Sequence, residues 1–175
     1  MEKCLESKRI YTGKILNLNV DRVILENGEK SFREYVMHRG AVAAIPIIDN
    51  RIIFVKQYRY AVRDYIVEIP AGTIEIGEEP EKTLKRELIE EIGYNAGKLT
   101  HLYSYYSTPG FTNEILHLYI AEELREEKGG KDPDEELEVI SFSFDESLKM
   151  LKEGKIKDGK TIIGLSLFFL GKYNI

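Results

Sequence analysis

The segment GEEPEKTLKRELIEEIG, residues 77–93, has the densest group of side chains that could catalyse a reaction or bind a metal ion. Its carboxylates crowd together at Glu87, Glu90 and Glu91. On a helix, like charges four residues apart repel by roughly a few tenths of a kcal/mol, and carboxylates near the C-terminus also oppose the helix dipole. One explanation is a solvated face on which Arg86 pairs with Glu90. The other is an oxygen-rich site for a hard divalent cation, for which magnesium is well suited, because the cation would offset the repulsion.

A helix is predicted over residues 80–92, and it would position these carboxylates. Pro80 suits a first helical turn, and Gly93 suits the residue after a helix end. At 100° per residue, Glu87 and Glu91 border the apolar stripe that faces the core. The stripe consists of Leu84, Leu88 and Ile92.

The rest of the chain predicts a mixed sheet with helices, an α/β arrangement of the α+β type. Residues 1–40 alternate apolar and polar side chains around an Asn27-Gly28 hairpin signal, which indicates a small antiparallel β unit. Residues 41–175 would form the main domain, with short and long helices near its end. Because strands mostly precede helices without regular alternation, a doubly wound parallel sheet is disfavoured. The strands predicted in this domain are 41–48, 51–60, 101–107, 114–124 and 137–144, and its later helices are 145–154 and 160–173.

Composition narrows the classes of partner. A chain of 175 residues with 43% hydrophobic content can bury one main core. Its net charge of -5 argues against nucleic acid and anionic membranes, which both require a basic surface. Cys4 has no internal partner, the N-terminus lacks a secretory pattern, and the longest apolar run is shorter than the ~20 residues of a membrane span. We therefore expect a cytoplasmic protein with small-molecule partners.

The glutamate segment resembles the signature of a known family. Gly72, Glu78 and the run RELIEEIGY fill every position of the pattern G-x5-E-x7-R-E-U-x-E-E-x-G-U, in which U is a bulky apolar or aromatic residue. This pattern is the Nudix box. The resemblance implies a Nudix fold, with a mixed sheet sandwiched between helices. It also implies a loop-helix-loop that binds magnesium, or manganese as the alternative, and hydrolyses a diphosphate linked to another moiety.

The resemblance also implies a role for each box residue. Glu87 and Glu91 would be the principal metal ligands, and Glu90 a further ligand or a water-holding group. Arg86 would orient the carboxylates, and Glu78 would brace the loop. The complete set of implied metal ligands is Ala71 through its carbonyl, Glu87, Glu90 and Glu91.

The flanking segments resemble one branch of the family. REYVMHRGAVAAIP, KQYRY, EIPAG and STPGFTNEILHLYIA are similar to segments of ADP-ribose pyrophosphatases, including the proline at Pro109. This likeness implies magnesium-dependent cleavage of ADP-ribose to AMP and ribose 5-phosphate. Two alternatives stay open: a pyrophosphatase for another nucleotide sugar or dinucleotide, and a nucleotide-sensing module that binds without cleaving.

Four side chains outside the box are candidate substrate contacts. Arg33 and Arg59 could bind phosphate, because a guanidinium fork matches phosphate oxygens, although surface ion pairs would also explain them. Glu68 and Glu114 could contact substrate or hold strands and backbone amides. The adenine requires an aromatic platform by stacking. The candidates for it are Tyr11, Phe32, Tyr35 and Tyr58.

The general base is expected on a loop. In similar enzymes it is a glutamate of a mobile loop, which here corresponds to residues 126–136. Glu135 is the first candidate, ahead of Glu136 and Asp134. Such a base has to come within hydrogen-bond reach of the attacking water.

The N-terminal β unit is expected to require a partner surface, because a few short strands bury little area alone. Similar enzymes are homodimers whose N-terminal strands exchange or pack across the two-fold axis and contribute to each other's substrate pocket. We expect the same arrangement for residues 1–40.

Overall fold

The computed structural model describes residues 1–127, 129 and 136–172. Its contacts divide the chain into two compact units. One unit contains Met1–Gly40 together with Tyr105–Ile115, and the other contains Ala41–Ser104 together with Leu116–Ile175. Each unit is described by itself below.

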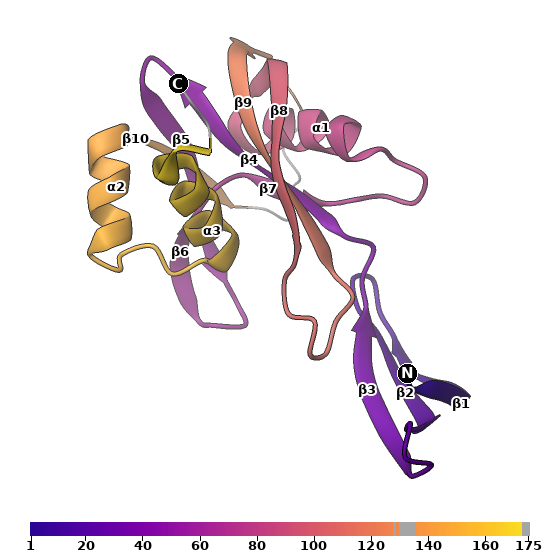
Figure 1. Cartoon of the computed structure of the whole chain (residues 1–175). Helices are drawn as coiled ribbons and strands as arrows, with labels where there is room; N and C mark the ends of the chain where they lie inside the picture. The colour runs from indigo at the N-terminus through magenta and orange to yellow at the C-terminus, as the bar shows by residue number, and fades with distance from the viewer. Residues whose placement is uncertain (128, 130–135, 173–175) are drawn as a thin grey trace. The chain divides into compact units, whose positions relative to one another are not determined.

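The first unit is built on a three-stranded antiparallel sheet of β1 (Lys3–Thr12), β2 (Asn17–Ile24) and β3 (Lys30–Met37), in that order (Figure 1). The hairpin between β2 and β3 turns where the Asn-Gly pair predicts it: Gly28 has φ 85°, and the Asn27 side chain accepts a hydrogen bond from the Glu29 amide. The predicted antiparallel β unit is therefore confirmed.

A segment remote in sequence joins this sheet. The Val36 amide donates to the Phe111 carbonyl at 2.8 Å, and the His38 amide donates to the Asn113 side chain at 2.7 Å. These bonds attach the connection between β8 (Tyr94–Tyr106) and β9 (Ile115–Glu126) to the end of β3.

The second unit has a mixed sheet at its centre. Its remaining strands are β4 (Ala41–Ile48), β5 (Arg51–Arg59), β6 (Asp64–Glu68), β7 (Ala71–Thr73) and β10 (Leu137–Ser143). The strand order is β10-β5-β4-β9-β8, with β6 beside β5 and β7 beside β4. β4 and β9 run parallel, whereas β5 is antiparallel to β4, β6 and β10. The predicted strands of the main domain thus form a mixed sheet, as expected.

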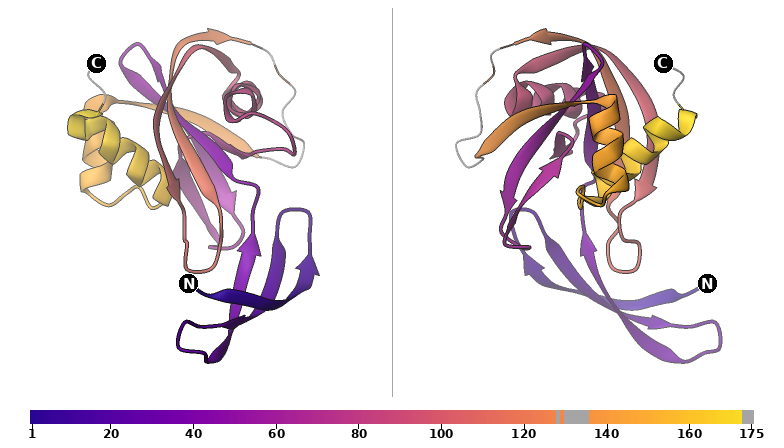
Figure 2. Two further views of the ribbon diagram at one scale, coloured as in Figure 1. Left: turned by 45° about the vertical axis from the view of Figure 1, so that its right-hand side comes forward. Right: turned by 90° about the vertical axis from the view of Figure 1, so that its left-hand side faces the viewer.

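Helices cover both faces of this sheet. The helix α1 (Pro80–Ile92) lies on one face, and α2 (Phe144–Lys152) and α3 (Gly159–Leu167) lie on the other (Figures 1 and 2). A short π-helical segment, η1 (Phe168–Lys172), follows α3. The prediction of a mixed sheet sandwiched between helices is confirmed.

The bounds of α1 agree with the sequence prediction. Pro80 occupies the first turn, and Gly93 ends the helix in the left-handed region with φ 76°. The predicted stripe of Leu84, Leu88 and Ile92 is buried against core residues of the sheet such as Val42 and Tyr119. Burial of this stripe fixes the rotation of α1 and hence the direction of its glutamates.

Two elements differ from their predicted bounds by more than a few residues. β8 begins at Tyr94, directly after Gly93, because Ala96 is buried in the core and the segment pairs as strand despite its polar neighbours. The final helix is interrupted after Leu167, and Gly171 adopts a left-handed φ of 78° that ends the regular turn. Across the described part of the chain, the helices are too short or too polar to cross a membrane.

Candidate functional site

The segment that precedes the box is held against α1 by a buried carboxylate. β7 pairs with the central strand β4, so that Ala71 lies beside Ala43. The Ala71 amide donates a hydrogen bond to Glu91 Oε2 at 3.0 Å, and Glu91 is buried. This bond joins the last turn of α1 to β7.

A glycine makes room for a second carboxylate. A Cβ atom at Gly72 would lie 2.0 Å from Cδ of Glu87, so no side chain fits there while Glu87 keeps its position. The Glu87 carboxylate therefore rests against the backbone of β7. Gly72 is required by this close approach and not by an unusual φ.

Arg86 connects the carboxylates of α1 with the loop before it. Its Nη1 atom lies 2.8 Å from Oε1 of Glu87 and 2.8 Å from Oε2 of Glu90, and its Nη2 atom lies 3.3 Å from Oε2 of Glu78. The hydroxyl of Thr83 also donates to Glu78 at 2.8 Å. These contacts join Arg86 to Glu78, Glu87 and Glu90, and the orienting and bracing roles remain predictions.

The charges of this group reinforce one another. Burial alone would lower the pKa of Arg86, but the hydrogen bond to Glu78 and the charges of Glu87 and Glu90 raise it above its ordinary value. The hydrogen bond from Thr83, together with Arg86, lowers the pKa of Glu78 despite the opposing effect of burial. Arg86 and Glu78 are thus both charged at neutral pH.

The donor set fits a hard divalent cation. Within the described residues, no three His, Cys, Asp or Glu side chains converge on a common point as they stand. Arg86 draws Glu87 and Glu90 to itself, while Glu91 faces the Ala71 amide. Magnesium nevertheless prefers oxygen ligands, and this segment offers several. They are the carboxylates on neighbouring turns of α1 and the backbone of β7, which has no side chain at Gly72.

A second charged group lies between β5, β6 and α3. Glu68 is buried, and its carboxylate accepts hydrogen bonds from Arg59 at 2.6 and 2.8 Å. Lys160 also donates to Glu68, and it lies 3.2 Å from Asp158. Burial acts to raise the pKa of Glu68, but the hydrogen bond from Arg59 and the charge of Lys160 outweigh it, so the pKa is below its ordinary value.

The start of α3 is fastened to the strand segment before the box. Asp158 caps the helix by accepting from the amide and the hydroxyl of Thr161, at 2.9 and 2.6 Å. The same hydroxyl accepts a hydrogen bond from the Ile69 amide at 2.9 Å. The cap of α3 therefore also fixes the backbone that leads to Ala71 and Gly72.

We expect Glu68→Gln to lower the free energy of unfolding by about 2 kcal/mol, because it leaves Lys160 and Arg59 without their buried counter-charge. Urea denaturation followed by circular dichroism measures this change. Glu138→Gln on β10 is the matched control: Glu138 pairs with Lys56 at 3.3 Å at the surface, and its loss should cost less than about 0.5 kcal/mol. Equal effects of the two variants would contradict the structural importance of the buried group.

The stabilisation of the fold by Glu68 is expected to depend on pH. The pKa of Glu68 is lowered in the folded protein, so its stabilisation is complete above the ordinary carboxyl pKa of about 4.3. It is lost as the pH falls through the lowered folded-state pKa. The stability difference between the parent protein and Glu68→Gln should therefore shrink below about pH 4.

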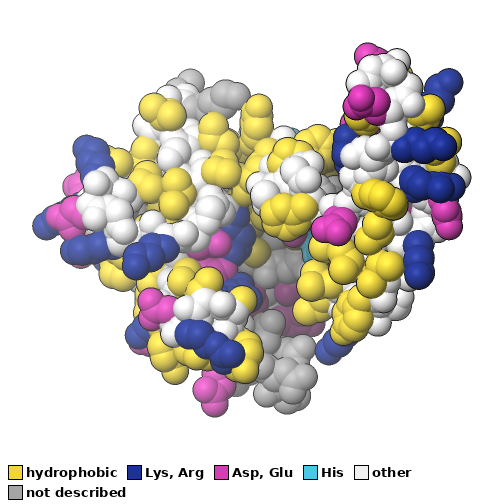
Figure 3. Space-filling view, turned by 90° about the horizontal axis from the view of Figure 1, so that it is seen from below, with side chains coloured by type: hydrophobic (Ala, Val, Ile, Leu, Met, Phe, Trp, Pro, Cys, Tyr) yellow, Lys and Arg dark blue, Asp and Glu magenta, His cyan; other side chains and the backbone are white. Residues whose placement is uncertain are grey.

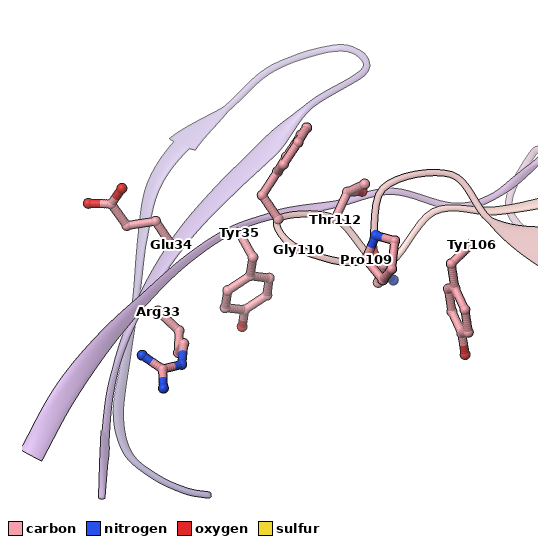
Figure 4. A pocket seen from close by; sticks show the side chains of 9 residues that line it. Arg33, Glu34, Tyr35, Tyr106, Pro109, Gly110 and Thr112 are labelled. Carbon is pink, nitrogen blue, oxygen red and sulfur yellow. The ribbon is translucent and has the colours of Figure 1, made fainter. Parts of the chain in front are cut away.

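An aromatic pocket of about 390 Å³ lies within the first unit. Arg33, Tyr35 and Tyr106 point to one side of it, whereas Glu34 points away (Figure 4). The pocket is completed by Pro109 to Asn113, which follow β8. Its ring faces and guanidinium are groups on which a planar aromatic ligand can stack.

The remaining predicted site residues are placed as follows. Arg33 pairs with Glu2 at 2.5 Å, and Glu114 accepts from Ser107 at 2.5 Å and lies 3.4 Å from Nδ1 of His38. Among the candidate aromatic platforms, Tyr35 alone lines this pocket. Tyr11 and Phe32 are exposed, and Tyr58 packs edge-on against Tyr65. Glu135 and Asp134 lie outside the described residues.

Sequence reasoning missed several members of these groups. Lys160 and Thr161 lie 92 residues beyond their partners Glu68 and Ile69, and Asp158 caps the same helix. Only the Asp-Gly-Lys-Thr cap pattern marks these residues in the sequence. Tyr106 lines the aromatic pocket as well, and no local signal in the sequence links it to Tyr35.

Family models match nearly the whole chain. A NUDIX domain model matches residues 37–163, and a model of the nucleoside diphosphate sugar hydrolase N-terminal domain matches residues 2–36.

Relatives of known name are similar over most of the chain. An ADP-ribose pyrophosphatase of Bacillus subtilis (strain 168) is 47% identical over 91% of this chain and 88% of its own length. A methanol dehydrogenase activator of Bacillus methanolicus is 45% identical over 94% of this chain and 90% of its own length. A GDP-mannose pyrophosphatase of Escherichia coli (strain K12) is 34% identical over 75% of this chain and 74% of its own length.

A solved structure supports the fold independently. The crystal structure of an ADP compounds hydrolase aligns with a TM-score of 0.86, covering 98% of this chain and 97% of that one. At 21% identity, this likeness concerns the fold alone.

Proposed function

Since this chain belongs to the Nudix family of hydrolases, we propose that it cleaves the diphosphate bond of ADP-ribose to AMP and ribose 5-phosphate with a magnesium cofactor. The observation that carries the proposal is the group formed by Arg86 and the α1 carboxylates against β7. The choice of substrate is supported by the relative named ADP-ribose pyrophosphatase.

The residues proposed to hold the cation are Glu87, Glu90, Glu91 and the Ala71 carbonyl. A bound magnesium ion, or manganese in its place, would neutralise diphosphate charge and make a water more acidic for attack on phosphorus. Arg86 has a separate task. By pairing with Glu87 and Glu90 it orients both carboxylates beside β7.

Other side chains are proposed to act on the substrate. Arg59 provides positive charge for the diphosphate, since its guanidinium is only partly covered by Glu68. Glu135 is the proposed general base. Glu68 acts on the substrate through Arg59 in this proposal, because its own carboxylate is buried.

The first unit is proposed to bind the nucleoside. Tyr35 lines the aromatic pocket together with Arg33 and Phe111, which suits a purine ring and its attached ribose phosphate. Glu114 borders this segment and is proposed to contact substrate from there. A pocket of about 390 Å³ is large enough for a nucleoside.

A homodimer is proposed, with exchange of strands from residues 1–40. Its support is the apolar surface of this unit: Leu5, Ile10, Tyr11 and Phe32 are exposed. Exposed apolar side chains gathered on one small sheet are typical of an interface.

The proposed cellular setting is the cytoplasm, without nucleic-acid or membrane partners. The net charge of -5 is unfavourable for binding polyanions. On the face shown in Figure 3, basic, acidic and apolar side chains are intermixed.

The function is tested by incubating the protein with magnesium and ADP-ribose, GDP-mannose, ADP-glucose, diadenosine polyphosphates or NADH, and identifying the products. We expect ADP-ribose to give the highest kcat/KM, with AMP and ribose 5-phosphate in equal amounts. GDP-mannose is the second candidate, because a relative of that activity is 34% identical. Preference for it would replace the proposed substrate, and binding of ADP-ribose without cleavage would favour a sensor.

A further inference from the structure

The charged group around Glu68 contains more positive charge than one carboxylate can neutralise. Arg59 and Lys160 both donate to Glu68, and Lys160 is shared with Asp158. The two cations are thus balanced by two carboxylates. If Lys160 were absent, the group would have a net negative charge, and the full charge of Glu68 would act on Arg59 alone.

The members of the group differ in exposure. The side chain of Glu68 is 3% exposed and that of Lys160 is 12% exposed, whereas that of Arg59 is 45% exposed. Arg59 therefore presents accessible positive charge to a depression of about 360 Å³, which exposed Lys157 also lines. Lys160 lines the same depression, but its side chain is mostly covered.

Arg59 is also within electrostatic reach of the box. The hydrogen bond to Glu68 is the main cause that raises the pKa of Arg59, and the charges of Asp158 and Glu91 add to it. The charge of Arg59 therefore interacts with that of Glu91 in the box as well as with those of Glu68 and Asp158.

We propose that Lys160 is a positioning residue for the diphosphate: by neutralising Glu68, to which Arg59 is hydrogen-bonded, it leaves the positive charge of the half-exposed Arg59 guanidinium available to attract the anionic substrate. This inference rests on the proposed function and deepens it. Without Lys160, the charge of Glu68 would offset that of Arg59, and the depression would attract a diphosphate less strongly. Lys160 needs no contact with the substrate for this effect.

The test compares three variants: Lys160→Met, Lys160→Arg, and the control Lys152→Met. Lys152 is an exposed cation near the end of α2 and has no ion pair among the residues described, so its removal changes the net charge equally. Two readouts are used: steady-state kinetics with ADP-ribose, and calorimetric binding of inorganic pyrophosphate with magnesium.

For Lys160→Met we expect KM and the pyrophosphate Kd to rise about tenfold, with kcat changed less than about threefold. Lys160→Arg should restore both values to within about threefold of the parent protein, and Lys152→Met should leave both unchanged. In an Arg59→Met background, Lys160→Met should add little, because its effect passes through Arg59.

The outcomes separate the two proposals. Unchanged KM and Kd in a folded Lys160→Met protein would overturn the positioning role. Additive effects of Lys160→Met and Arg59→Met would overturn it too, because they would indicate that Lys160 contacts the substrate directly. A parent protein that does not bind pyrophosphate would overturn it as well. If the parent protein cleaves no nucleotide sugar yet loses pyrophosphate affinity in Lys160→Met, the proposed function fails while the positioning role stands.

Discussion

Glu91→Gln is expected to lower kcat/KM for ADP-ribose by about 10³-fold while the protein remains folded. Glutamine is nearly isosteric and keeps an oxygen that can accept the 3.0 Å hydrogen bond from the Ala71 amide, so β7 stays joined to α1. The substitution removes the negative charge of a buried carboxylate proposed to bind the cation. Activity should therefore fall far more than stability.

Steady-state kinetics and urea denaturation measure the two effects separately. The control is Glu81→Gln, which removes an exposed carboxylate from the first turn of the same helix. It should leave kcat/KM within about twofold of the parent protein, since the charge lies away from the box carboxylates. A Glu91→Gln protein with near-normal turnover would remove Glu91 from the proposed metal ligands. Manganese binding followed by electron paramagnetic resonance should weaken in this variant and not in the control.

The local geometry of α1 could be predicted from the sequence because it depends on short-range rules. Pro80 and Gly93 mark the ends, and the 3.6-residue period places Leu84 and Leu88 in the core. Once this stripe is buried, the rotation of the helix is set, and the positions of the neighbouring carboxylates are set with it. The edge position expected for Glu91 is confirmed by its burial.

The long-range groups could not be predicted, because they depend on strand order and helix docking. The sequence left Arg59 with either a phosphate-binding or an ion-pair role, and Glu68 with either a substrate-binding or a strand-holding role. The structure pairs the two with each other. Lys160 reaches Glu68 across 92 positions of sequence. Neither periodicity nor composition predicts this contact between Lys160 and Glu68, because it forms only when α3 packs on the face of the sheet opposite α1.

The residues that line the aromatic pocket of the first unit could not be predicted from the sequence either. Tyr35 was one of four equivalent aromatic candidates, and the sequence offered no means to choose among them. The choice follows from the backbone bonds that bring Phe111 beside Val36, on a segment remote from β3 in the chain. A tertiary contact therefore distinguishes Tyr35 where the residue type could not.

The position of Glu87 depends on the absence of a side chain on β7. A Cβ atom at Gly72 would lie 2.0 Å from Cδ and 2.4 Å from Cγ of Glu87, closer than any real contact. β7 is held by its pairing with β4, so the backbone has little freedom to retreat. The Glu87 side chain is the part that can move. Its displacement costs the fold little but removes a carboxylate from its place beside Glu91 and Arg86.

Gly72→Ala is accordingly expected to reduce kcat/KM by about 10²-fold while lowering the free energy of unfolding by less than about 1 kcal/mol. Kinetics and urea denaturation of the same preparations test both parts. In a Glu87→Gln background the added alanine should change kcat/KM by less than about threefold, because the two substitutions disable one ligand. If the effects of the two substitutions on kcat/KM were fully additive, Gly72 would act independently of Glu87. Normal activity of Gly72→Ala would show that the Glu87 carboxylate functions from a different position.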